Sequence, residues 1–97
     1  MRQLKTKDIF TMSKILEKLE LKIDAENKSQ EQLGAELILK IGENLHKAEK
    51  EINEFLADLK EITVEEFENL SIKEVINIFN EFKNLEGVKD FLSSAGR

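Results

Sequence analysis

The chain contains no proline, cysteine, tryptophan or tyrosine, and only four of its 97 residues are glycine. Sheet-rich domains of this length need more turn-forming residues, so their scarcity favours an all-α fold. Without cysteine the chain has no disulfides and no thiolate metal ligands, which is compatible with a reducing cytoplasm. No apolar run approaches the roughly 18 residues of a membrane span, and the first residues lack the apolar stretch of a signal peptide. We therefore expect a cytoplasmic protein with no membrane partner.

Charge is unevenly distributed along the chain, whose formal net charge is −5. Residues 1–23 contain six basic and three acidic side chains, whereas residues 24–97 contain nine basic and seventeen acidic ones. An acidic body argues against nucleic-acid binding, because phosphate contacts need a concentrated basic face. The basic segment either contacts an acidic partner or is solvated surface that partly complements the acidic remainder.

One long stretch shows an unbroken helical periodicity. Its apolar residues alternate in steps of three and four: Ile38, Ile41, Leu45, Ala48, Ile52, Phe55 and Leu59. This spacing places them in one seam along a helix. Ser29 and Gln32 have the spacing of a capping box that starts such a helix. We predict a single central helix over 30–60, near 45 Å long at roughly 1.5 Å per residue. Gly42 within it either admits a neighbouring helix or is simply tolerated.

Shorter helices are predicted on both sides of this seam. The periodicity and capping patterns place them at 7–20 with Thr6 as N-cap, at a turn after the Thr63–Glu66 box, at 72–84 after the Ser71–Glu74 box, and at a last turn over 88–92. Segment 22–30 is predicted to be a linker. On the helix over 72–84, one face is expected to contain Ile72, Val75, Ile76, Phe79 and Phe82. Apolar residues form 40% of the chain, enough for one domain over 1–97, with fraying expected at 1–5 and 93–97.

No catalytic or metal-binding constellation is apparent. His46 is the only histidine, and Glu43 and Glu49 lie one turn away on either side. Structural zinc and di-iron sites need three or more convergent ligands, so we expect a solvated histidine, no metal and no cofactor. The chain also lacks a glycine-rich phosphate loop and an oxyanion-hole signature. An enzyme is therefore not expected.

Apolar residues outside the main seam suggest an interaction surface. Leu39 and Leu56 lie on a second line of the predicted long helix, and Ile78 lies at the edge of the face predicted for 72–84. A core that touches two neighbouring helices would account for these residues. The alternative is that they form an apolar surface that accepts a partner helix. Leu39, Leu56 and Ile78 are therefore the candidate partner-binding residues.

Three blocks of the chain resemble the tail assembly chaperones of long-tailed, siphovirus-type phages and prophages of Gram-positive bacteria. They are residues 2–16 (RQLKTKDIFTMSKIL), 44–59 (NLHKAEKEINEFLADL) followed by 63–67 (TVEEF), and 82–92 (FKNLEGVKDFL). Together they cover nearly the whole chain, and the middle block is the most specific. The resemblance does not mark which positions contact a partner.

This resemblance implies a chaperone of virion assembly in the bacterial cytoplasm that is absent from the mature virion. Such proteins bind the largely helical tape measure protein and keep it soluble while tail tube subunits polymerise around it. The implied partners are the tape measure protein and the tail tube protein. Two alternatives remain open from the residues alone. One is a homo-oligomeric helical module without a client, and the other is a small DNA-binding regulator, which would show salt-sensitive DNA affinity.

Overall fold

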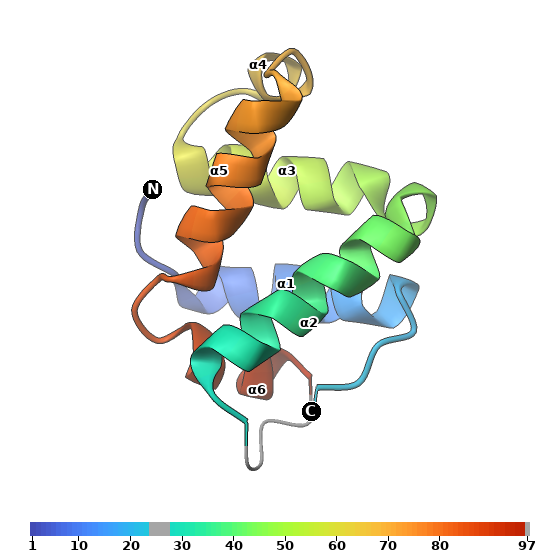
Figure 1. The fold of residues 1–97 in the computed structure, drawn as a ribbon, viewed down its shortest axis with the longest axis vertical. Helices are drawn as coiled ribbons and strands as arrows, with labels where there is room; N and C mark the ends of the chain where they lie inside the picture. The colour runs from blue at the N-terminus through green and yellow to red at the C-terminus, as the bar shows by residue number, and fades with distance from the viewer. Residues whose placement is uncertain (24–27, 97) are drawn as a thin grey trace.

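The computed structural model describes residues 1–23 and 28–96, and in these residues all regular secondary structure is helical (Figure 1). The elements are α1 (Thr6–Lys18), α2 (Gln30–Glu43), a 3₁₀ turn η1 (Leu45–Lys47), α3 (Glu49–Lys60), α4 (Val64–Glu68), α5 (Ile72–Lys83) and α6 (Val88–Ala95). The predicted all-α fold is therefore confirmed. No helix in the described part of the chain is long and apolar enough to cross a membrane.

The three predicted capping boxes are all present. Ser29 at the start of α2 accepts a hydrogen bond from the Gln32 amide at 3.1 Å, and Gln32 accepts one in return from the Ser29 amide at 2.9 Å. Equivalent boxes begin α4 at Thr63 and α5 at Ser71. At α1, however, the N-cap is Lys5 rather than Thr6, because the Lys5 amide donates to the Asp8 carboxylate at 2.8 Å.

The single helix predicted over 30–60 is wrong. The backbone leaves the helical region at Asn44 (φ −132°, ψ 33°) and again at Ala48 (φ −136°, ψ 25°). A straight helix of about 45 Å would exceed the longest dimension of the molecule, 37 Å. The break directs α2 onto α5 and α6, and α3 onto α1 and α4. Both halves of the seam therefore still reach the core, where Ile41, Ala48, Ile52, Phe55 and Leu59 are buried.

Three phenylalanines of the core join three helices. Phe55 of α3 lies 5.7 Å from Phe82 of α5 and 6.1 Å from Phe91 of α6, measured between ring centroids. Phe82 and Phe91 complete the triangle at 6.3 Å. Edge-to-face and stacked pairs at these separations each contribute about 0.5–1.5 kcal/mol beyond the area they bury. This trio fixes α3, α5 and α6 relative to one another.

The buried side of α5 differs from the predicted one. Ile78, expected at the edge of the apolar face, is 3% exposed and belongs to the core with Phe82. Ile72 and Ile76, expected on the buried face, are 80% and 54% exposed. The periodicity identified an apolar arc correctly, but the neighbouring helices cover a different part of it.

A close approach between helices occurs at Gly34, not at Gly42. A Cβ atom at Gly34 in α2 would lie 2.5 Å from Cγ of Lys83 in α5, whereas a Cβ at Gly42 would meet nothing within 4 Å. Gly34 therefore permits the close crossing of α2 and α5. Of the two interpretations given for Gly42, the second holds: this glycine is tolerated in the helix and admits no neighbour.

Both segments that were expected to fray are partly fixed in the structure. The Arg2 amide donates to the Leu59 carbonyl at 2.9 Å, and Leu4 packs against the core. Helix α6 continues through residues 93–95, where Ala95 is 4% exposed. The linker predicted over 22–30 includes residues 24–27, which lie outside the described residues.

Candidate interaction surfaces

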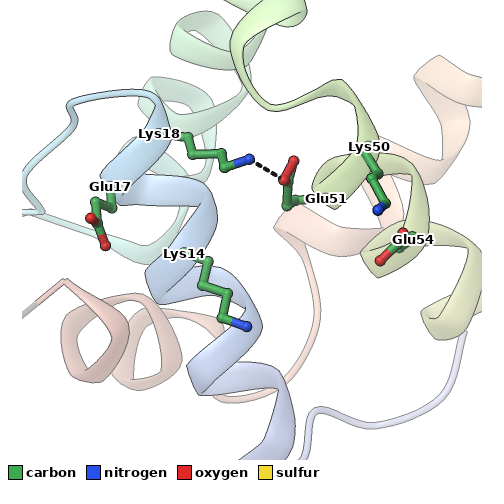
Figure 2. Close-up of a pocket in the computed structure, with 6 residues that line it drawn as sticks. All are labelled: Lys14, Glu17, Lys18, Lys50, Glu51 and Glu54. Atoms are coloured by element: carbon green, nitrogen blue, oxygen red, sulfur yellow. Dashed lines mark hydrogen bonds and ion pairs between the residues drawn. The ribbon is translucent and has the colours of Figure 1, made fainter.

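A shallow pocket of about 370 Å³ lies between α1 and α3 (Figure 2). Three lysines and three glutamates line it: Lys14, Glu17, Lys18, Lys50, Glu51 and Glu54. The two helices contribute equal shares of this lining, and the opposite charges balance. Such a lining has no net charge with which to select an ionic ligand.

The pocket instead marks an ionic junction between α1 and α3. Lys18 Nζ lies 2.5 Å from Glu51 Oε2, as the dashed line in Figure 2 shows. The hydrogen bond from Lys18 lowers the pKa of the Glu51 carboxyl below its ordinary value. Lys18 is more than half exposed, so solvent screens this pair and limits its contribution to stability.

A more buried ionic cluster joins the N-terminal segment to the ends of α1 and α3. The Arg2 guanidinium donates two hydrogen bonds to Asp8, each 2.8 Å long, and a further one to the Asp58 carboxylate. Its Nε also donates to the Asp58 carbonyl at 3.2 Å. Lys7 forms an exposed ion pair with Asp58 at 3.1 Å. Asp8 is 2% exposed, so this bidentate pair lies at the edge of the core.

The titration of these groups reflects their hydrogen bonds. Burial acts to raise the pKa of Asp8, but the bonds from Arg2 and from the Lys5 amide outweigh it, so the pKa is lowered. The hydrogen bond from Arg2 likewise lowers the pKa of Asp58, and the bond to Asp8 raises the pKa of Arg2. All three groups therefore remain charged at neutral pH.

Only part of this cluster was predictable from local sequence patterns. The charge distribution offers complementation of the acidic remainder as one role of the basic segment 1–23. The pairing of Arg2 with Asp58 joins residues 56 positions apart, and no local pattern selects Asp58 from twenty acidic residues. Sequence reasoning therefore missed the partner.

Among the side chains that the structure describes, four large apolar ones are exposed, and they lie on three helices. Phe10 in α1 is 67% exposed and Leu39 in α2 is 62% exposed. In α5, Ile72 is 80% exposed, the most of the four, and Ile76 is 54% exposed, the least. Single exposed apolar residues are common on proteins. Ile72 and Ile76 differ from the other two because they lie one turn apart on the same helix.

The three predicted partner-binding residues do not lie on a common surface. Leu39 is exposed, whereas Leu56 is 2% exposed and Ile78 is also buried. Of the two interpretations, burial in the core therefore holds for Leu56 and Ile78, and neither offers the exposed surface that partner binding needs. Partner binding by Leu39 stays a prediction.

His46 lies exposed in η1, and both Glu43 and Glu49 are exposed as well. Within residues 1–23 and 28–96, no group of three or more histidine, cysteine, aspartate or glutamate side chains is arranged to hold a metal ion. The predicted solvated histidine agrees with this placement.

Comparison of the chain with known protein families, with curated proteins and with solved structures finds no match in any of the three.

Proposed function

We propose that this protein is a tail assembly chaperone that binds the tape measure protein of a long-tailed phage and keeps it soluble in the bacterial cytoplasm. The tail tube protein is a second proposed partner, which displaces the chaperone as it polymerises. Two features support the proposal. One is the resemblance carried by the blocks 2–16, 44–59 with 63–67, and 82–92. The other is the distribution of apolar and charged side chains on the folded chain.

The observation that carries the proposal is the exposure of Phe10, Leu39, Ile72 and Ile76 on an otherwise charged helical protein. A long amphipathic client aggregates through its own apolar stripes. A small partner that contributes apolar contacts and carries net negative charge would cover those stripes and keep the complex soluble. Several copies bound along one client would combine contacts that are individually weak into a stable complex.

Co-expression with the tape measure protein encoded in the same genome tests this function. The expected result is a soluble complex containing several copies of this protein per client chain, measured by affinity purification and light scattering. The client expressed alone should be insoluble. If the client stays insoluble and this protein elutes alone, the chaperone proposal fails, and a self-associating helical module becomes the better interpretation.

Leu39 provides a direct test of the apolar mechanism. Leu39→Glu places a charge where the client would contact an exposed leucine, so we expect the yield of soluble complex to fall several-fold while the helical circular dichroism is unchanged. Gln3→Glu is the control, because Gln3 is exposed outside α2 and the substitution adds the same charge without removing a large apolar side chain. Equal yields from both variants would contradict a role for Leu39.

A further inference from the structure

The break between α2 and α3 has weak local signals. No proline or glycine lies between Glu43 and Glu49. Asn44 ends many helices in the left-handed region, but here its φ is −132°. Helix α3 begins after Ala48, whose methyl group cannot accept a hydrogen bond, whereas α2, α4 and α5 each begin with a serine or threonine that does. Packing of the two helices on the core, and not the local sequence, therefore holds the break in place.

A continuous helix through this turn would satisfy the local sequence better. The apolar seam keeps its steps of three and four from Ile41 through Ala48 to Ile52. The break leaves the last carbonyls of α2 and the first amides of α3 without partners inside a helix, and a continuous helix would pair them. Such a helix, about 45 Å long, exceeds the 37 Å length of the single folded chain. The straight form therefore needs a second chain to complete the core.

The turn divides the chain into two halves that pack on each other. The first half contains α1 and α2, and the second half contains α3 to α6 (Figure 1). Helix α1 packs against α3 and α6, and α2 packs against α5 and α6. The buried side chains of the first half therefore depend on the second half for their cover; they include Met12, Ile15, Leu33 and Leu37.

We propose that two copies of the chain form a domain-swapped dimer. In each chain, residues 44–48 become helical and join α2 to α3 in one continuous helix. Helices α1 and α2 of one copy then pack on α3 to α6 of the other, in the positions that they occupy within the single chain. Exchange of this kind needs no new surface, because the interface is the core that the chain already contains. The inference does not depend on the chaperone function.

The polar contacts between the halves can re-form between the two copies. The Gln30 side chain donates to the carbonyls of Lys83 at 3.2 Å and Leu85 at 2.9 Å, and Arg2 donates to Asp58. None of these groups belongs to the turn, so its conversion to helix leaves their geometry intact. Each dimer gains helical hydrogen bonds at two turns and loses the freedom of one separate chain. The dimer should therefore accumulate at high protein concentration.

A pair of cysteines distinguishes this dimer from side-by-side association. The chain has no cysteine of its own. A Cβ at Gly34 would lie 3.2 Å from Cβ of Lys83, close to the roughly 3.5–4.5 Å found in disulfides. Gly34 belongs to the first half and Lys83 to the second. In the variant Gly34→Cys with Lys83→Cys, the disulfide lies within the chain of a monomer and between the two chains of a swapped dimer.

The measurement begins with refolding of this variant from urea at high concentration. Size-exclusion chromatography with light scattering then separates a monomer of 11.2 kDa from a dimer of twice that mass. After oxidation, a gel without reductant should show covalent dimers from the dimer fraction and single chains from the monomer fraction. The control is Gly42→Cys with Lys83→Cys, because a Cβ at Gly42 meets nothing within 4 Å. Covalent dimers from the control would represent unspecific oxidation.

Substitutions at Asn44 test the conversion of the turn into helix. Asn44→Ala and Asn44→Gly both remove the side-chain amide that donates to the Lys40 carbonyl at 3.3 Å. They differ in helix propensity, which favours alanine by about fivefold at each position inside a helix. With two such turns in each dimer, the association constant of Asn44→Ala should exceed that of Asn44→Gly by roughly 20-fold. Light scattering over a concentration series measures both constants.

Three outcomes would overturn the inference. Oxidation of the dimer fraction to single chains alone would mean that whole copies associate through their surfaces. Equal association constants for Asn44→Ala and Asn44→Gly would mean that the turn does not become helical. A monomer at every concentration, for the wild type and for Asn44→Ala, would mean that the halves do not exchange. The variants at Asn44 still decide the question if the cysteine pair does not fold, and failure to bind the tape measure protein leaves this inference unaffected.

Discussion

Helices α3 and α5 are both twelve residues long and both are amphipathic, yet they bury their apolar residues to very different extents. In α3 every aliphatic and aromatic side chain is buried. In α5 only Ile78 and Phe82 are buried, although α5 contains six such side chains. The difference follows from their neighbours: α3 is packed between α1 and α4, whereas α5 packs mainly against α2.

This comparison shows that apolar periodicity identifies the apolar face of a helix. It does not show which residues of that face are buried by neighbouring helices. An apolar residue in α3 serves folding. An equally apolar residue on the outer part of α5 costs little to replace and is available for contact with another molecule. The two helices should therefore respond in opposite ways to the same substitutions.

The largest contrast is expected from truncating one aliphatic side chain in each helix. Leu56→Ala in α3 should lower the free energy of unfolding by about 2–5 kcal/mol, because it removes buried methyl groups and leaves a cavity. Ile72→Ala in α5 should change it by no more than about 0.5 kcal/mol, because the side chain is already in water. Urea unfolding measures both values. Similar losses in the two variants would mean that α5 is covered in solution.

A second contrast concerns how the two helices are held at their ends. The C-terminal end of α3 is tied to Arg2 through Asp58 and the Leu59 carbonyl, whereas α5 begins with a local capping box. Arg2→Ala should cost about 2 kcal/mol at neutral pH, since it leaves the buried Asp8 carboxylate without its bidentate partner. Lys18→Ala is the control, because it removes a cation from an exposed pair and should cost less than about 1 kcal/mol.

The pH dependence of Arg2→Ala gives an independent check. Because the pKa values of Asp8 and Asp58 are lowered in the folded state, their contribution is present above the ordinary aspartate pKa and is lost as pH falls below about 4. The free energy of unfolding of the wild type should fall between about pH 5 and pH 3, and that of Arg2→Ala should fall less. The free energies of unfolding of the two proteins would thus differ most at neutral pH. Parallel curves for the two would contradict the proposed charge state of the cluster.

Features that depend on contacts within four residues were predictable from the sequence. The boxes at Ser29, Thr63 and Ser71 each use two groups three residues apart, so spacing alone identifies them. The helical class followed equally from local properties, namely the absence of proline and the recurrence of apolar residues. Local chemistry therefore predicted where most helices begin.

Features that depend on the path of the chain were not predictable in this way. The seam through Ile41, Ala48 and Ile52 keeps its periodicity across the break, so nothing in the pattern signals that the helix ends at Glu43. Once the helix breaks, positions before and after it no longer share a face. This explains why Leu39 and Leu56, predicted on one line, differ so strongly in exposure.

The smallest difference is expected between substitutions of the two glycines of α2. It tests the packing of α2 against α5. Gly34→Ala should lower the free energy of unfolding by about 1 kcal/mol, because the new Cβ would lie 2.5 Å from Cγ of Lys83 and would push α5 away from α2. Gly42→Ala should raise it by about 0.5–1 kcal/mol, because alanine favours the helix and its Cβ meets open space. Thermal unfolding of the pair separates packing from helix propensity. Stabilisation by both substitutions would show that the Lys83 side chain moves aside at little cost.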